Sequence, residues 1–360
     1  YDTLRDHTPV ALFPREIDYT EWQTLRRYPI LNWNMGMTYR LRERDERVYP
    51  QGELARRTIG QVGDKGNYGV EYVLRDVLEG RDGKARRQRI ARGFYGRVVG
   101  GDNSEPEDGL DVVTTLDLEM QDVADRALRR QLEAQNALWG TALVMEVATG
   151  DLLAMANLSR TKSGAYAEVK NHALSSRMEP GSTFKLAALL ALVDDAGMSL
   201  DETFDTGNGA RVKVGRTTVQ DSHGLPPLNL KDAVAHSSNV FFARAVYETY
   251  KDDPERYVDY LRHLHLDRTV GLEEFGAVAP IFPAPGMKIW YPDVSIVNMG
   301  YGYAIELTPL HTLTLYNAVA NDGCMVAPRL VREIRRGGEV VDTFYRLIRP
   351  RPNFYSRFTT

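Results

Sequence analysis

Apolar residues beyond position 110 recur at two spacings, and these spacings predict both strands and helices. Residues 112–116 favour a strand, and over residues 116–128 the apolar positions recur every three or four residues, as they do on one face of a helix. Residues 141–147 and 152–158 are two further strand-like runs, and the turn residues between them predict a β-hairpin. This part of the chain is therefore expected to begin with a strand, a helix and a hairpin.

Three apolar helices are predicted further along the chain. The first covers residues 182–196 and ends at Gly197, a residue type that readily adopts the left-handed backbone found at helix ends. The second begins near Asn239, and the third begins at Thr308-Pro309, where a capping residue precedes a proline in the first turn. Strands flanked by apolar helices indicate a sheet that is covered by helices.

The first part of the chain differs from the rest. It is rich in arginine and turn signals, and the polar stretch at residues 100–109 separates it from the apolar segments that follow. A chain of 360 residues is also longer than one hydrophobic core usually serves. We therefore expect two domains, a smaller one over residues 1–105 and a larger one over residues 106–360.

Charge and composition narrow the possible functions. The 45 basic and 49 acidic residues give a net charge of −4, which does not indicate a polyanionic partner, so we expect no binding to nucleic acid. The single Cys324 excludes an intramolecular disulfide, and His263 and His265 have no evident third ligand, so we expect neither a metal nor a cofactor. The longest aliphatic run, residues 186–193, is too short to cross a bilayer. Because the chain begins at Tyr1 rather than Met, any leader or anchor is expected upstream.

The strongest local signal is the segment Ser182-Thr183-Phe184-Lys185, which follows Pro180-Gly181 at the start of an apolar helix. Residues three apart share a helical face, so the Lys185 amine can reach the Ser182 hydroxyl and take its proton, which a serine nucleophile requires. A capped core helix without catalytic function would explain the same residues. A second Ser-x-x-Lys sequence begins at Ser159, but it lies in a polar stretch with no apolar helix to fix its geometry.

A second motif, Ser237-x-Asn239, follows Lys185 at the start of the next predicted helix. A hydroxyl and an amide two residues apart can relay a proton and hold a substrate amide. Serine and asparagine are also common helix caps, so a purely structural role explains the pair as well.

Ser-x-x-Lys followed by Ser-x-Asn opens the motif set of penicillin-binding proteins and class A β-lactamases. The surrounding sequence resembles the class B penicillin-binding proteins, particularly the cell-division type, closely beyond residue 105 and more faintly before it. The segments that carry this resemblance occur in the family's order, at residues 109–121, 145–156, 179–185, 237–240, 300–310 and 321–328.

The resemblance implies an α+β transpeptidase fold, with a five-stranded antiparallel sheet between helical layers, preceded by a mixed pedestal domain and a membrane anchor. It also implies a bacterial, periplasmic peptidoglycan D,D-transpeptidase that cross-links stem peptides in septal wall synthesis. Carried over by position, Ser182 is the nucleophile that attacks the penultimate D-Ala carbonyl, Lys185 its base and Ser237 the proton relay. Asn239 would hold the substrate amide and Lys185. β-Lactams would trap Ser182, and a membrane glycosyltransferase and division proteins are the expected partners.

The sequence departs from the family pattern at one motif. No lysine after Asn239 is followed by Thr-Gly or Ser-Gly, and Lys162-Ser163-Gly164 precedes the nucleophile. Because a second cation is one source of a lowered lysine pKa, Lys185 would tend to stay protonated without it. We expect that the given chain omits residues near or after its end, since a sheet without its inner strands would expose unpaired edges.

Two alternatives remain open from the sequence. The chain could be a catalytically silent scaffold that binds cell-wall synthesis partners through its N-terminal domain. It could also be a relative that hydrolyses or senses β-lactams with the same nucleophile, although a compact β-lactamase does not need the N-terminal domain.

Overall fold

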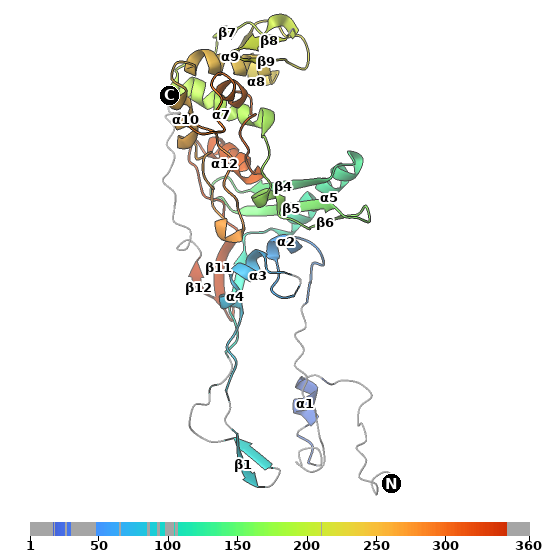
Figure 1. Ribbon diagram of the computed structural model, residues 1–360. Coiled ribbons are helices and arrows are strands. Elements are labelled where there is room, and N and C mark those ends of the chain that lie inside the picture. Colours follow the sequence, from blue (N-terminus) through green and yellow to red (C-terminus); the bar gives the residue numbers. More distant parts are fainter. Residues whose placement is uncertain are drawn as a thin grey trace. The chain divides into compact units, whose positions relative to one another are not determined.

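The structure is a computed structural model that describes residues 17, 19–25, 27–29, 48–64, 66–84, 87–91, 94–97, 104, 107–209 and 211–343. The chain divides into two units, residues 1–50 and residues 51–360. In the first unit the structure describes one helix, α1 (Tyr19–Leu25). The remaining elements belong to the second unit (Figure 1). The sequence-based division into residues 1–105 and 106–360 stays a prediction.

The second unit begins with three short helices, α2 (Arg56–Ile59), α3 (Gly69–Val73) and α4 (Arg75–Leu78), of which α3 contacts both others. The strands β1 (Arg87–Ala91) and β2 (Phe94–Arg97) follow and pair with each other as a hairpin. Gly60 and Gly69 bring α2 and α3 into contact, because a Cβ atom on Gly69 would lie 2.5 Å from the Cα atom of Gly60. Both residues also have positive φ angles, which glycine adopts without strain.

One antiparallel sheet joins a strand near residue 110 to two strands near the end of the described chain. Its order is β12 (Glu339–Thr343), β11 (Val331–Arg336) and β3 (Asp111–Thr114). The Thr115 hydroxyl donates to the carbonyl oxygens of Leu152 and Arg329, at 2.8 and 3.0 Å, and so fixes the end of β3 to the neighbouring segments. The strand predicted at residues 112–116 is confirmed.

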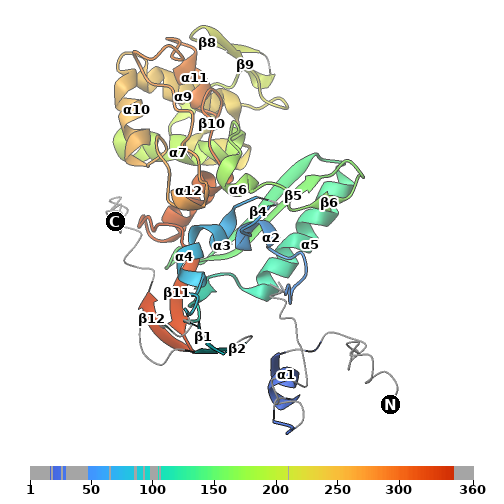
Figure 2. The same ribbon diagram turned by 60° about the horizontal axis from the view of Figure 1, so that its bottom comes forward.

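The predicted hairpin is also confirmed. Strands β4 (Trp139–Met145) and β5 (Leu152–Arg160) pair antiparallel, and the short β6 (Tyr166–Ala167) adds to β5. Helix α5 (Leu118–Ala134) packs on this sheet, as Figure 2 shows, and begins at Asp117, whose side chain accepts a hydrogen bond from the Met120 backbone N–H. Within the described residues this sheet has three strands, whereas the family resemblance implies five.

A helical core forms the rest of the unit. Its central helix is α9 (Asn239–Tyr250), in which Val240, Phe241 and Phe242 are fully buried. The helix predicted at residues 182–196 consists of a 3₁₀ turn η1 (Gly181–Phe184), an α-helical part α7 (Lys185–Leu190) and a π-helical turn η2 (Ala191–Asp195). Gly197 follows with a φ of 67°, as its predicted role at the helix end requires.

The remaining elements surround this core. The predicted helix after Thr308 is α12 (Pro309–Ala320). The others are α6 (His172–Ser175), β7 (Thr203–Phe204), η3 (Gly207–Gly209), β8 (Val212–Val214), β9 (Thr217–Val219), β10 (Leu228–Asn229), α8 (Leu230–Ala235), α10 (Pro254–His263), η4 (Glu273–Phe275) and α11 (Ser295–Met299).

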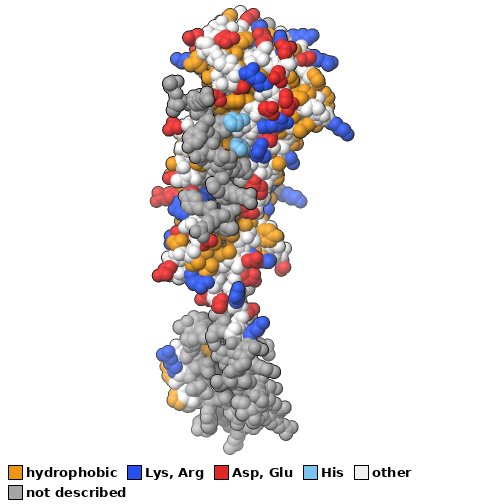
Figure 3. Space-filling view, turned by 90° about the vertical axis from the view of Figure 1, so that its left-hand side faces the viewer, with side chains coloured by type: hydrophobic (Ala, Val, Ile, Leu, Met, Phe, Trp, Pro, Cys, Tyr) orange, Lys and Arg blue, Asp and Glu red, His pale blue; other side chains and the backbone are white. Residues whose placement is uncertain are grey.

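Among the described residues, no helix has the length and apolar character that crossing a membrane requires. On the face of the second unit seen in Figure 3, acidic and basic side chains are interspersed with apolar ones. This distribution agrees with the near balance of charge in the sequence.

Candidate active site

Ser182 lies in the first turn of the helix that carries Lys185, and the two side chains have very different exposure. The Ser182 side chain is exposed, whereas Lys185 is only 6% exposed. A segment distant in sequence fixes the turn that contains Ser182, because the Gly302 carbonyl oxygen accepts a hydrogen bond of 2.9 Å from the Gly181 N–H. Gly302 has a φ of 90°, and a Cβ atom there would lie 1.9 Å from the Gly181 carbonyl oxygen, so this contact requires glycine.

All four residues that the sequence singled out meet at the Lys185 amine. The Nζ atom of Lys185 donates to Ser182 Oγ at 3.2 Å, to Ser237 Oγ at 3.0 Å and to Asn239 Oδ1 at 2.7 Å. It also donates to the Ser237 backbone carbonyl. An ammonium has three protons, so it cannot donate to all four acceptors at once. Both serine hydroxyls lie within hydrogen-bond distance of the amine, which is therefore placed to exchange a proton with either of them.

Burial makes the neutral, proton-accepting form of the Lys185 amine more available near neutral pH than it is in an ordinary lysine. Loss of contact with water lowers the pKa of Lys185 to about 8, because the charged form is poorly solvated there, while the negative charge of Asp221 acts in the opposite direction. The Phe242 ring, 5.9 Å from Nζ, is part of these dry surroundings. With a pKa of about 8, about a tenth of the Lys185 side chains are neutral at pH 7.

Asp221 organises the turn that carries the second motif. Its Oδ2 accepts from the Ser238 hydroxyl at 2.7 Å, and its Oδ1 accepts from the backbone N–H groups of Asn239, at 2.5 Å, and Val240, at 3.2 Å. Ser237 itself has a φ of 53°, a left-handed conformation that is strained for serine. The buried Asp221 carboxylate therefore stabilises the strained turn at Ser237 through its hydrogen bonds to the three residues that follow it.

The capping role that the sequence left open belongs to a different serine. The Ser238 hydroxyl accepts a hydrogen bond of 3.0 Å from the Phe241 N–H and so caps α9. This leaves the Ser237 hydroxyl and the Asn239 amide oxygen on the side of Lys185. Sequence reasoning did not find Asp221, because nothing in the spacing of this residue distinguishes it from other turn aspartates.

The second Ser-x-x-Lys sequence is built differently. The Ser159 hydroxyl is hydrogen-bonded to His172 Nε2 at 2.8 Å, and the His172 ring stacks on Trp139 with the ring centroids 4.1 Å apart. Lys162 is exposed in a loop, and within the described residues no contact joins it to Ser159. Ser159 thus lacks the lysine partner that Ser182 has.

The described residues contain no group of three or more His, Cys, Asp or Glu side chains that could hold a metal ion.

Comparisons with known proteins identify relatives over most of the chain. Residues 140–351 match the model of the penicillin binding protein transpeptidase domain. Penicillin-binding protein PbpB of Mycobacterium tuberculosis is 30% identical over 305 residues, which are 80% of this chain and 43% of the relative. The probable peptidoglycan D,D-transpeptidase PenA of Neisseria meningitidis is 27% identical over 292 residues, 78% of this chain and 48% of the relative.

Solved structures give the same result. The crystal structure of penicillin binding protein 3 from Mycobacterium tuberculosis, complexed with aztreonam, is 28% identical with a TM-score of 0.66. The alignment covers 81% of this chain and 62% of that one. The chain spans about half the length of the curated relatives that it matches.

Proposed function

Because this chain belongs to the penicillin-binding protein transpeptidase family, as a class B member, we propose that it is a serine-type peptidoglycan D,D-transpeptidase that β-lactams inhibit covalently. The observation that carries the proposal is the exposed Ser182 hydroxyl 3.2 Å from the buried Lys185 amine. The names of the relatives support the same activity, since they include a probable peptidoglycan D,D-transpeptidase and a penicillin binding protein complexed with aztreonam.

In the first step, Ser182 Oγ attacks the carbonyl carbon of the penultimate D-Ala of a stem peptide. Neutral Lys185 takes the hydroxyl proton, and the tetrahedral intermediate carries its negative charge on the former carbonyl oxygen. Backbone N–H groups of the turn at Ser182 lie at the start of a helix, where the helix dipole favours negative charge.

In the second step, the bond to the terminal D-Ala breaks. The leaving nitrogen needs a proton, and Ser237 Oγ, 3.0 Å from Lys185 Nζ, is placed to pass it from the ammonium. Free D-Ala leaves, and the stem peptide remains as an ester on Ser182. Asn239 accepts from Nζ through Oδ1 and so keeps the amine directed toward both serines.

In the third step, an amine of a neighbouring stem peptide attacks the ester. The same base removes a proton from this amine, the new amide bond forms, and the Ser182 hydroxyl is regenerated. The sequence of steps is balanced in atoms and electrons with only the two peptides, and it uses no cofactor. A β-lactam would follow the first step and open its ring, and its leaving nitrogen would stay attached to the acyl group.

The test is the intact mass of the full-length protein after incubation with a β-lactam. We expect a long-lived adduct of the mass of the drug, which is lost in Ser182→Ala and kept in Ser159→Ala. Rapid turnover of the drug would identify a hydrolase instead, and the absence of an adduct would favour the catalytically silent scaffold.

The cellular setting belongs to the same proposal. The relatives include stage V sporulation protein D of Bacillus subtilis, 24% identical over 302 residues, and we propose for this protein a role in septal wall synthesis. We place the protein at the periplasmic face of the bacterial inner membrane, where its substrates lie, with a membrane glycosyltransferase and division proteins as partners. Localisation of a tagged full-length protein at the septum would support this setting, and an even distribution around the cell would contradict it.

A further inference from the structure

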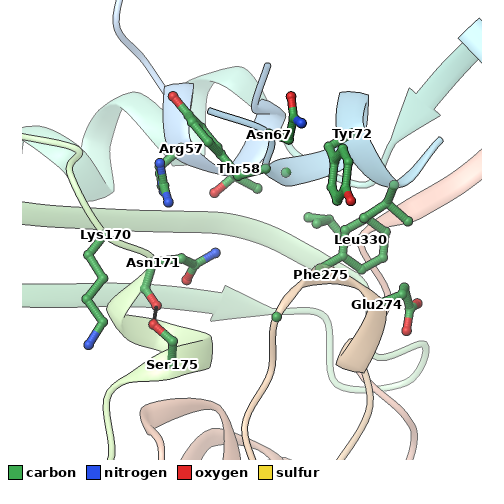
Figure 4. A pocket seen from close by; sticks show the side chains of 14 residues that line it. Arg57, Thr58, Asn67, Tyr72, Lys170, Asn171, Ser175, Glu274, Phe275 and Leu330 are labelled. Atoms are coloured by element: carbon green, nitrogen blue, oxygen red, sulfur yellow. Dashed lines mark hydrogen bonds between the residues drawn. The ribbon is translucent and has the colours of Figure 1, made fainter. Parts of the chain in front are cut away.

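A cavity of about 260 Å³ lies in the second unit, away from Ser182. Helices α2 and α3 form one wall, and α6, η4 and Leu330 form the other (Figure 4). A second cavity of about 300 Å³ adjoins it, since both are lined by Tyr72, Val73 and Glu274. Neither cavity is lined by any of the residues assigned to the transpeptidase mechanism.

One end of the first cavity is cationic. The Arg57 guanidinium stacks on the Tyr68 ring, with its central carbon 3.5 Å from the ring centroid. Its backbone N–H donates to Glu168 at 2.7 Å, and this bond fixes the start of the side chain. Lys170 lines the same end. Among the described residues, neither cation has an acidic partner. A planar guanidinium held by stacking, with its N–H edge unused, is suited to binding a carboxylate.

The opposite end carries one negative charge. In Figure 4, Glu274 and Tyr72 lie on the side of the cavity away from Arg57 and Lys170. Glu274 is exposed on η4 and has no basic partner within the described part of the chain. Phe275 and the buried Leu330, which lie on the same side of the cavity as Tyr72 and Glu274 in Figure 4, supply an apolar surface.

This polarity restricts the class of ligand. A polyanion such as a nucleotide would be repelled by Glu274. A purely apolar ligand would displace water from Arg57, Lys170 and Glu274 without giving these charged side chains a partner, which is unfavourable. A short peptide with free termini matches both charged ends and the apolar surface beside Glu274. We propose that this cavity binds such a zwitterionic peptide, with its carboxylate at Arg57 and Lys170, an apolar side chain over Phe275 and Leu330, and its ammonium at Glu274.

The proposal is tested with three probes on the 360-residue chain carrying Ser182→Ala, so that it does not depend on the proposed function. The probes are trialanine, N-acetyl-trialanine, which lacks the ammonium, and trialanine amide, which lacks the carboxylate. Titration calorimetry measures their binding. We expect trialanine to bind in the millimolar range, the acetylated peptide about threefold more weakly and the amide at least about tenfold more weakly.

Protein variants then locate the binding. Arg57→Ala should weaken trialanine binding about tenfold, and the exposed Arg126→Ala on α5 is the matched control that should leave it unchanged. Glu274→Gln should weaken trialanine about threefold and leave N-acetyl-trialanine unaffected, because that probe has no ammonium to lose. Circular dichroism confirms that each variant is folded, and the exposed position of Glu274 keeps the test valid if Arg57→Ala does not fold.

The acetylated probe also distinguishes two sources of the ligand. A peptide joined to a carrier through its amino end has no free ammonium, whereas a free peptide has one. Equal binding of trialanine and its acetylated form would overturn the role of Glu274 and with it the zwitterionic ligand. Absence of heat at millimolar trialanine, or equal affinity of Arg57→Ala and Arg126→Ala, would overturn the site itself.

Discussion

The lowered pKa of Lys185 has a consequence for stability that can be measured without any substrate. The folded protein holds the pKa of Lys185 at about 8 through burial, whereas a lysine in an unfolded chain has a pKa of about 10.4. Between these two values the unfolded chain binds one more proton than the folded one. Stability therefore rises with pH across this window, because the slope of the unfolding free energy follows the extra protons bound by the unfolded state.

The size of this effect follows from the two pKa values. Each unit of difference corresponds to about 1.4 kcal/mol, so Lys185 contributes a gain of about 2 to 3 kcal/mol between pH 7 and pH 10. The sign is opposite to that of a lysine that gains an acidic partner on folding. At pH 7 the buried ammonium destabilises the folded state, and deprotonation relieves that penalty.

The assay is chemical denaturation of the wild type and of Lys185→Met at pH 7 and pH 10. Other titrating groups, including the buried tyrosines Tyr250 and Tyr257, affect both proteins alike and cancel in the difference. We expect the advantage of Lys185→Met over the wild type to shrink by about 2 to 3 kcal/mol from pH 7 to pH 10. Lys162→Met removes an exposed lysine and should run parallel to the wild type. If the curves of Lys185→Met and the wild type were also parallel, the assignment of a depressed pKa to Lys185 would be wrong.

Three further changes test the site. Lys185→Ala should slow acylation by a β-lactam at least about a hundredfold while the protein stays folded, as intact-mass kinetics would show, and unchanged kinetics would remove its role as base. Asp221→Asn should move the midpoint of the acylation pH profile to lower pH, because the charge of Asp221 raises the pKa of Lys185; an unmoved midpoint would contradict this coupling. Gly302→Ala should lower the melting temperature and the acylation rate together, since its Cβ would collide with the Gly181 carbonyl oxygen. Gly276→Ala, at a similar φ of 92° with open space around it, is the matched control and should keep full activity.

Local patterns in the sequence were sufficient for much of the fold. The hairpin β4–β5 and the starts of α9 and α12 were predicted because each depends on spacing and capping within a few residues. The fold class and the family are confirmed by the match over residues 140–351 and by the solved relatives. The catalytic roles of the four site residues stay predictions, although the structure brings their side chains together.

What the sequence could not provide depends on contacts between distant segments. The choice between Ser237 and Ser238 as the helix cap is decided by Asp221, which lies far enough away that no local rule connects them. The cavity at Arg57 is a similar case, because its walls come from α2, α6 and η4. The π-helical turn Ala191–Asp195 was also missed, since helical periodicity does not separate it from the α-helix before it.

The absence of a Lys-Thr/Ser-Gly sequence after Asn239 suggested that Lys185 would stay protonated for lack of a second cation. In the structure, however, desolvation is the largest cause of the lowered pKa of Lys185 and already brings this pKa to about 8. A base matched to neutral pH needs only about one further unit, equivalent to about 1.4 kcal/mol. That is a small demand, and it is within the range that one nearby cation or the further exclusion of water by a bound peptide supplies. Within the described part of the chain, burial of the amine is thus the largest cause of the lowered pKa of Lys185.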